Sequence, residues 1–184
     1  MKKKLIAIFV ALIIAALSPW LAKHLPDSRL PPAPPGYYHV VEFADGDTIT
    51  VDMNGTKEKI RFIGVDTPET HDPRKAVQCF GAAAAAFTKQ RIGNSPVRLE
   101  ADPTNTNRDR YKRLLRYVYL PDGTLVNAEI IKQGYGFAYT SFPFTKLDEF
   151  KQLQAEAQNQ KRGLWGSCTP QTNQYGGYTS NDAR

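Results

Sequence analysis

A short segment of this 184-residue chain, RFIGVDTPET at 61–70, concentrates charged side chains around one Thr-Pro step. Arg61 lies inside an apolar run, where a charged group is costly unless it is paired. Its guanidinium offers two parallel donors to a phosphate, although an ion pair with a nearby acid would also account for it. Glu69 could activate or orient a water molecule. These residue types indicate phosphate chemistry.

Carboxylates that could hold a cation occur within and before this segment. Asp47 belongs to the triplet DGD at 45–47, and Asp66 and Thr67 follow the apolar run. Two carboxylates and a backbone carbonyl, without a neighbouring histidine or cysteine, suit a hard cation such as Ca²⁺ or Mg²⁺. A DGD triplet alone is also typical of a simple turn, so the cation site depends on the whole set.

Basic side chains crowd one later stretch, 108–116, in which Asp109 is the only acid and Tyr111 lies among them. Basic residues interleaved with an aromatic ring suit a phosphate backbone and a stacked base, whereas a solvated charged face is the simpler explanation. Beside an acid–arginine site, the stretch completes a set suited to phosphodiester hydrolysis, in which cations neutralise charge that develops on phosphorus. The basic residues are Arg108, Arg110, Lys112, Arg113 and Arg116.

The elements that must position these groups begin with a β-hairpin. Two alternating runs, 48–53 and 57–63, flank an Asn-Gly step that is typical of a two-residue turn. With that turn, Thr48 lies opposite Arg61, and Asp47 reaches the same end of the hairpin. The strict register puts the Asp47 and Arg61 side chains on opposite faces, unless a bulge just before Asp47 reverses this.

The rest of the chain alternates between strand-like and helix-like patterns. Five strands with helices between and after them predict an α+β fold, in which a five-stranded OB-fold β-barrel packs against three helices. The expected strands are about 39–43, 48–53, 57–63, 97–101 and 114–120, and the expected helices are about 82–91, 126–133 and 145–160, the last with a Thr-x-x-Asp start.

Both ends of the chain lie outside this domain. Residues 1–22 combine lysines with an apolar run close to the length of about 20 residues that spans a membrane, so we expect an N-terminal apolar helix, either a signal-anchor or a signal peptide. Residues 23–38 hold five of the 13 prolines and predict an extended spacer. The domain is expected over 39–167 and a flexible tail over 168–184. We expect an exported monomer, membrane-anchored and facing the periplasm or the exterior, or secreted if cleaved.

Charge and cysteine content narrow the functional classes. The net charge is +6, but residues 1–38 hold five basic residues and one acid, so most of the excess lies there. Only the local basic cluster therefore supports a nucleic-acid partner.

Cys79 and Cys168 are the two cysteines. They cannot form a zinc site alone, but in an exported protein they can form a disulfide; two unrelated thiols are the alternative.

Three segments carry a family resemblance. DGDT at 45–48, RFIGVDTPET at 61–70 and DRYKRLLRYVY at 109–119 resemble, in order, the signature segments of the staphylococcal-type thermonuclease family. The stretches FGAAAAAFTKQ, LVNAEIIKQGYG and GLW are also similar, so the resemblance covers about residues 39–166. It implies an OB-fold barrel with three helices that hydrolyses DNA and RNA, mainly single-stranded or frayed, and leaves 3′-phosphates.

The resemblance also implies roles for individual residues. A Ca²⁺ ion would be held by the carboxylates of Asp47 and Asp66 and by the carbonyl of Thr67. The other implied residues are the catalytic glutamate Glu69, the phosphate-binding Arg61 and Arg113, and the substrate-binding Arg110, Tyr111 and Tyr139.

Some positions depart from the family pattern. Arg110 stands where the family has a lysine, Lys112 where a glycine is usual and Arg116 where a small residue is usual. We interpret the chain as an exported, calcium-dependent nuclease acting on single-stranded DNA and RNA. A non-catalytic OB-fold nucleic-acid-binding module is the alternative; it would need the basic groove but neither the metal-binding acids nor Glu69. A calcium-stabilised structural domain would leave the arginines unexplained.

Overall fold

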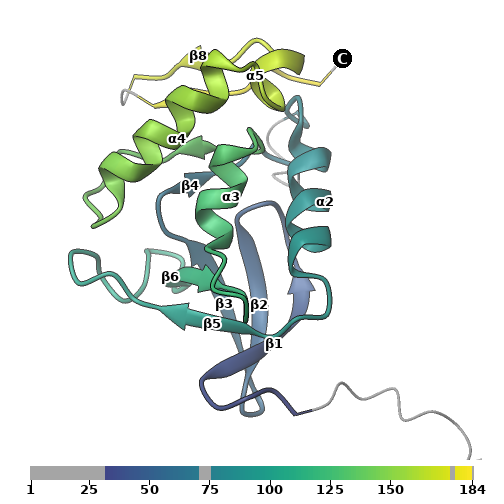
Figure 1. Cartoon of the computed structure of the whole chain (residues 1–184), viewed down its shortest axis with the longest axis vertical. Helices are drawn as coiled ribbons and strands as arrows, with labels where there is room; N and C mark the ends of the chain where they lie inside the picture. The colour runs from purple at the N-terminus through teal and green to yellow at the C-terminus, as the bar shows by residue number, and fades with distance from the viewer. Residues whose placement is uncertain (1–31, 71–75, 175–176, 184) are drawn as a thin grey trace, which may run out of the picture. The chain divides into compact units, whose positions relative to one another are not determined.

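Five β-strands close into a barrel in the computed structural model (Figure 1). Neighbouring strands are antiparallel except β3 and β6, which run parallel. This is the five-stranded OB-type barrel that the sequence predicts. In the order in which they pair, the strands are β1 (Tyr37–Phe43), β2 (Thr48–Met53), β3 (Thr56–Phe62), β6 (Leu114–Tyr119) and β5 (Val97–Glu100), and β5 pairs with β1.

The structure describes residues 32–70, 76–174 and 177–183. The apolar segment at 1–22 and most of the proline-rich spacer lie outside the described residues. Within those ranges, no helix has both the length and the apolar character needed to cross a membrane. Strand β1 begins at Tyr37, two residues before the domain boundary expected at 39.

The β2–β3 hairpin has the predicted register. Thr48 pairs with Arg61 and Ile49 with Ile60. The connecting residues Asn54 and Gly55 have φ values of 57° and 92°, the positive values that a tight two-residue turn requires. The turn therefore fixes which residue of β3 stands beside the end of β2.

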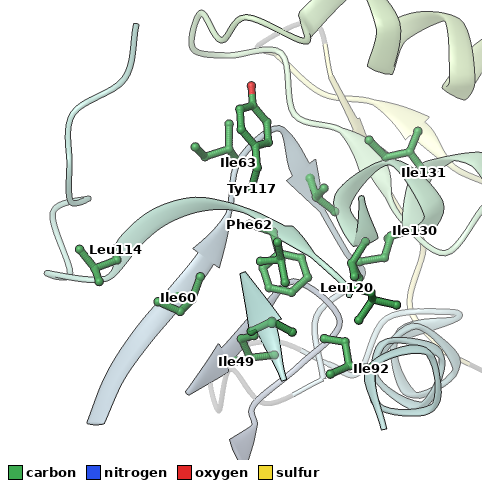
Figure 2. Packing of buried hydrophobic residues seen from close by; sticks show 14 of the residues in the cluster. Ile49, Ile60, Phe62, Ile63, Ile92, Leu114, Tyr117, Leu120, Ile130 and Ile131 are labelled. Atoms are coloured by element: carbon green, nitrogen blue, oxygen red, sulfur yellow. The ribbon is translucent and has the colours of Figure 1, made fainter. Parts of the chain in front are cut away.

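The core fills the barrel and extends under the helices (Figure 2). Alternate residues of the hairpin, including Ile49 and Phe62, are buried inside the barrel, while Ile92 and Ile130 come from two covering helices. The helices are α2 (Gly81–Ile92), α3 (Val126–Lys132), α4 (Leu147–Asn159) and the four-residue α5 (Leu164–Ser167). The three longer helices match the three that the sequence predicts.

The start of α4 differs from the expected capping pattern. Its N-cap residue is Lys146, and no side chain caps the helix. The Thr145 hydroxyl, expected to bond within the helix, donates instead to Asp102 Oδ2 at 2.7 Å, as does the Thr145 amide. A buried carboxylate attracts these donors more strongly than a helix end does, because charge-assisted hydrogen bonds are the stronger kind.

Asp102 fixes the loop between β5 and β6. It is 4% exposed and accepts hydrogen bonds from the amide and hydroxyl of Thr104, from Tyr117 and from Thr145. Burial alone would raise the pKa of this carboxyl, but the hydrogen bonds outweigh burial and hold the pKa well below its usual range. The basic loop that follows is thereby attached to the start of α4.

Asp102→Asn should lower the free energy of unfolding by on the order of 2 kcal/mol at neutral pH, because an amide cannot accept the same set of donors. The ionised carboxylate stabilises the fold above its unfolded pKa of about 4. That contribution disappears as the pH falls through the lower folded pKa. The difference from the native protein, measured by urea unfolding at several pH values, should therefore shrink below about pH 4. A difference independent of pH would contradict this, and Asp148→Asn, at an exposed acid of α4, is the control.

The C-terminal segment, residues 168–174 and 177–183, lies where the sequence predicts a flexible tail. Its short strands β8 (Gln171–Thr172) and β9 (Tyr178–Thr179) pair with each other. The Tyr178 ring lies 6.0 Å from that of Phe137 and 5.0 Å from that of Trp165. Tyr178 thus connects a segment of otherwise polar composition to β7 and α5 through ring contacts.

A disulfide joins Cys79 to Cys168, a sequence separation of 89 residues. The bond connects the segment before α2 to the residue that follows α5. In the chain-entropy account, closing a loop of this length stabilises the fold by on the order of 4 kcal/mol. The bond also fixes the point from which the C-terminal segment departs.

Candidate active site

A tight return of the chain after β3 builds one end of the site. Gly64 has a φ of 71°, and a Cβ there would lie 2.6 Å from the Phe144 ring, so only glycine fits. The chain then enters β4 (Val65–Asp66), which pairs with β7 (Phe137–Ala138). This return brings the Val65 carbonyl to 2.6 Å from Arg61 Nη1.

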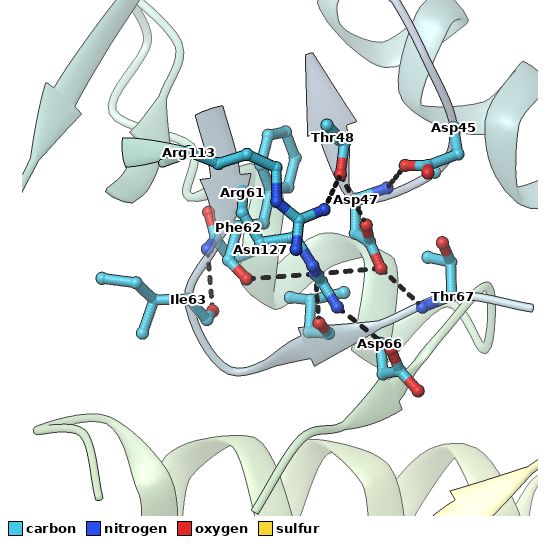
Figure 3. A network of polar contacts seen from close by, with 12 residues as sticks. Asp45, Asp47, Thr48, Arg61, Phe62, Ile63, Asp66, Thr67, Arg113 and Asn127 are labelled. Atoms are coloured by element: carbon cyan, nitrogen blue, oxygen red, sulfur yellow. Dashed lines mark hydrogen bonds and ion pairs between the residues drawn. The ribbon is translucent and has the colours of Figure 1, made fainter. Parts of the chain in front are cut away.

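Arg61 holds two carboxylates (Figure 3). Its Nη1 lies 2.9 Å from Asp47 Oδ2, and its Nη2 lies 3.0 Å from Asp66 Oδ1. The Arg61 side chain is only 14% exposed. Burial disfavours the charged guanidinium, but the attraction of Asp47 and Asp66 outweighs burial and raises the pKa of Arg61. Arg61 is therefore a fixed cation shared by two acids.

Asp47 reaches Arg61 from an irregular turn. The amides of Ala44 and Asp45 both donate to the Thr48 carbonyl, at 3.1 and 3.4 Å, and the Asp47 carbonyl accepts the Phe62 amide at 2.9 Å. Asp47 thus stands opposite Phe62, as the register predicts, but it precedes the first residue of β2. Because Asp47 lies outside the strand, its side chain need not follow the alternation of β2. Asp47 can therefore stand opposite Phe62 in the register and still direct its carboxylate to Arg61.

The Asp47 carboxylate is fixed by neighbours as well as by Arg61. The Thr67 amide donates to Oδ2 at 2.9 Å, and the Thr48 hydroxyl donates to Oδ1 at 3.0 Å. A Cβ on Gly46 would lie 2.8 Å from Thr67 Cγ2, so glycine permits this close approach. Asp47, with a side chain 6% exposed, therefore presents its carboxylate in one orientation.

The carboxylates of Asp47 and Asp66 together carry two negative charges, and the single positive charge of Arg61 balances only one of them. Burial and the neighbouring Asp47 raise the pKa of Asp45 to about 7. Among the described residues, no ready-made group of three or more histidine, cysteine, aspartate or glutamate side chains forms a metal centre. The oxygen-only donor set of Asp47, Asp66 and the Thr67 backbone, beside excess negative charge, nevertheless fits a hard divalent cation.

A second arginine reaches the same cluster from the basic loop. Arg113 Nε donates to Asp109 Oδ2 at 2.7 Å, and Arg113 Nη1 lies 3.5 Å from the Thr48 hydroxyl. Asp109 also accepts the amides of Tyr111 and Arg113, both at 2.9 Å. A continuous set of contacts therefore runs from Arg113 through Thr48 and Asp47 to Arg61 (Figure 3).

The other predicted substrate-binding residues lie at the surface. Tyr111 is 62% exposed, and its hydroxyl accepts from Arg110 Nη2 at 2.7 Å. The guanidinium carbons of Arg110 and Arg113 lie 4.8 and 5.3 Å from the Tyr111 ring centre, within cation–π range. Tyr139, directly after β7, is 38% exposed.

Not every basic residue of the loop serves this cluster. Arg108 makes a two-point contact with Glu58, at 2.9 Å from each nitrogen, and Arg116 donates to Asn107 at 2.8 Å. These two arginines brace the loop. Arg110 and Arg113 thus lie against the exposed Tyr111 ring, whereas Arg108 and Arg116 hold the loop in place.

Glu69 is held through its backbone. Its amide donates to Gln78 Oε1 at 2.8 Å, and its carbonyl accepts the Gln78 amide at 2.9 Å. Its own Oε1 accepts the Thr70 amide at 2.9 Å. Sequence reasoning missed Gln78, and likewise the supporting roles of Thr48 and Asp109. For Asp109, the four-residue spacing to Arg113 was an available signal, whereas no local pattern marks Gln78.

Comparison with known proteins finds relatives of this chain. Residues 59–167 match the family described as Staphylococcal nuclease homologue. A protein named Thermonuclease from Staphylococcus hyicus is 41% identical over 131 residues, which cover 71% of this chain and 76% of that protein. The Thermonuclease of Staphylococcus intermedius is 42% identical over 129 residues, covering 70% and 75%. Endonuclease YncB of Bacillus subtilis (strain 168) is 40% identical over 131 residues, covering 70% and 61%.

The closed barrel and these relatives together identify the class of the protein, an OB-fold hydrolase that acts on nucleic acids. The chain belongs to the staphylococcal nuclease family, as its motifs predict. It is therefore a nuclease rather than a non-catalytic OB-fold binding module, and nucleic acids are its substrates.

Asp109→Asn should lower nuclease turnover on single-stranded DNA by on the order of tenfold, because Arg113 loses the partner that aims it and misplaced groups lose catalytic effect. The amide oxygen can still accept the two loop amides, so the fold should persist. Initial rates of nucleotide release, with thermal unfolding measured in parallel, check this. Asp148→Asn, an exposed acid in the first turn of α4, is the matched control, and native turnover in Asp109→Asn would show that Arg113 needs no such partner.

Proposed function

We propose that this nuclease hydrolyses phosphodiester bonds of single-stranded DNA and RNA, depends on Ca²⁺ and leaves 3′-phosphates. The contact set at the hairpin end supports this most directly. Arg61 lies 2.9 Å from Asp47 and 3.0 Å from Asp66, and Arg113 reaches the same cluster through Thr48. Two guanidinium groups beside two carboxylates suit an anionic substrate that is brought in with a cation.

Asp47, Asp66 and the Thr67 carbonyl are the proposed Ca²⁺ ligands. When bound, the ion would supply positive charge that neutralises the phosphate. Asp47 is nearly buried and fixed in orientation, whereas the Asp66 side chain is 42% exposed. One ligand is thus rigid and the other faces solvent, which suits a site that an ion and a substrate must both enter.

Arg61 and Arg113 are the proposed phosphate donors. A guanidinium presents two parallel N–H groups that match two phosphate oxygens. Hydrogen bonds that strengthen as negative charge grows on phosphorus stabilise the transition state more than the bound substrate. Buried placement of Arg61 enhances this effect, because a low local dielectric strengthens each charged contact.

Glu69 is the proposed residue that orients or deprotonates the attacking water. As that water attacks phosphorus, the bond between phosphorus and the 5′ oxygen breaks. The 5′ oxygen leaves as a hydroxyl, and the phosphate stays on the 3′ oxygen. Tyr111 and Tyr139 support a single-stranded substrate, since their exposed rings can stack on unpaired bases. Bases within a duplex are already stacked and paired.

Glu69→Gln should reduce turnover on single-stranded DNA by on the order of 10²-fold or more, because the amide cannot take a proton from water. Substrate affinity should change little, since the side chain keeps its size.

Arg113→Ala should lower turnover on single-stranded DNA by on the order of 10²–10³-fold, as for other donors to a charged transition state. Asp47→Ala should raise the Ca²⁺ concentration that gives half-maximal rate. The measurement is initial rate over a Ca²⁺ titration, with the product ends identified by mass spectrometry.

The control for the arginine variant is Arg98→Ala. Arg98 lies on β5 and pairs with Glu100 at 2.9 Å, so its loss should leave turnover within about twofold of native. Cleavage that resists a chelator would refute the metal dependence. Native turnover in an Arg61→Ala/Glu69→Gln double variant would show that the active site lies elsewhere.

We also propose that the protein is exported and that residues 1–22 hold it at a membrane, facing the periplasm or the exterior. The Cys79–Cys168 disulfide supports export, because such bonds persist in oxidising compartments. Cells expressing the full chain should show nuclease activity in the membrane fraction, accessible from outside the cytoplasm. A soluble protein whose N-terminus lies near residue 19 or 23 would instead establish a cleaved signal.

A further inference from the structure

The residue next to Gln78 is fastened to the C-terminal segment in three ways. Cys79 forms the disulfide with Cys168. Its amide donates to the Asn181 carbonyl at 2.7 Å, and its carbonyl accepts the Ser180 hydroxyl at 2.9 Å. Ser180 is 4% exposed, so this contact is shielded from competing water. The C-terminal segment therefore determines where Cys79 lies.

Gln78 connects the same segment to Glu69. Its side-chain oxygen accepts the Glu69 amide at 2.8 Å, and its side-chain nitrogen donates to the Thr179 hydroxyl at 3.2 Å, across a separation of 101 residues. A backbone N–H can only donate, so the Gln78 oxygen must face Glu69 and its nitrogen must face Thr179. One side-chain amide thus bridges the proposed water-activating residue and the C-terminal segment.

The backbone at Glu69 has little room to shift. A Cβ on Gly81, the first residue of α2, would lie 2.7 Å from Thr70 Cγ2 and 3.0 Å from the Glu69 carbonyl. The start of the helix therefore packs directly on this backbone, and the two Gln78 hydrogen bonds also hold it. The position of Glu69 depends on contacts with residues 78–81 rather than on its own side chain alone.

The C-terminal segment also supports the strand that carries Asp66. Tyr178 stacks on Phe137 with ring centres 6.0 Å apart. Phe137 pairs with Asp66 in the β4–β7 sheet. The same segment therefore contacts the immediate supports of two proposed site residues, Glu69 through Gln78 and Asp66 through Phe137.

We propose that Gln78 is a positioning residue for Glu69, and that the disulfide-fastened C-terminal segment keeps Gln78 in place. The inference rests on the proposed role of Glu69 in activating water. Full turnover then requires the oxidised chain. Reduction, which adds two electrons and two protons to give two thiols, removes the covalent one of the three contacts that hold Cys79 and lowers turnover, so the nuclease is most active in an oxidising compartment.

The first test uses the oxidised full chain with single-stranded DNA and saturating Ca²⁺. Gln78→Leu should lower kcat by on the order of tenfold and leave KM within about twofold, because it displaces Glu69 without touching substrate. Thr179→Val is nearly isosteric and exposed, so it keeps the fold, and should lower kcat by about threefold. Thr172→Val, on the paired strand β8, is the control and should leave kcat native. Native kcat in both Gln78→Leu and Thr179→Val would overturn the proposal.

A double-variant comparison separates this proposal from the proposed function. If Gln78 acts through Glu69, Gln78→Leu should cost nothing further in a Glu69→Gln background. The same tenfold loss in that background would overturn the positioning role. Native turnover in Glu69→Gln alone would instead refute the function proposed for Glu69. A loss in Glu69→Gln with none in Gln78→Leu would refute only the present inference.

The disulfide is tested with a phosphine reductant and with a Cys79→Ser/Cys168→Ser variant, both assayed below the unfolding temperature found by circular dichroism. Reduction of the native protein should lower kcat to the level of the double variant, and the double variant should not respond to the reductant. If kcat stays native after both cysteines are shown by mass to be reduced, the dependence on the disulfide is wrong.

Discussion

A buried guanidinium beside two carboxylates is the constraint that shapes this end of the barrel. Arg61 must remain paired, because removing one partner of a buried ion pair costs on the order of 3–5 kcal/mol. Apolar residues of similar size often stabilise a fold at least as well as such a pair, so stability alone does not explain it. The proposed function supplies a reason for the pairing, since Arg61 would donate to the substrate phosphate while Asp47 and Asp66 would hold the cation.

The surrounding elements satisfy that constraint from several directions. The turn at Gly46 brings Asp47 in, and it is secured by the Thr88 hydroxyl of α2, which donates to the Gly46 carbonyl at 2.7 Å. The return at Gly64 brings Asp66 in. The long loop between β5 and β6 is attached at Asp102 before it delivers the second arginine. Rigid supports thus surround groups that stand on turns and loops, an arrangement that favours fixed active-site geometry.

Local chemistry explains what the sequence could predict. The Asn54-Gly55 turn specifies the hairpin register, and an alanine-rich run specifies α2. The approach of Asp47 to Arg61 was predictable only as a gathering at one hairpin end, because Asp47 lies just outside the strand and escapes its alternation. Long-range contacts had no local signal. Thr145 bonds to Asp102 rather than capping α4, and Tyr178 packs on Phe137 and Trp165 from a segment of polar composition.

The barrel is not closed equally well around its circumference. Strands β2 and β3 pair from Thr48 to Met53, whereas β1 meets β5 only where Tyr37 faces Arg98 and Tyr38 faces Val97. A short seam opens at lower free energy than a long one, so local opening begins there. Tyr37 is also the first residue of β1. Tension transmitted along the chain from its N-terminal side would therefore reach this seam before it reaches Arg61 on β3.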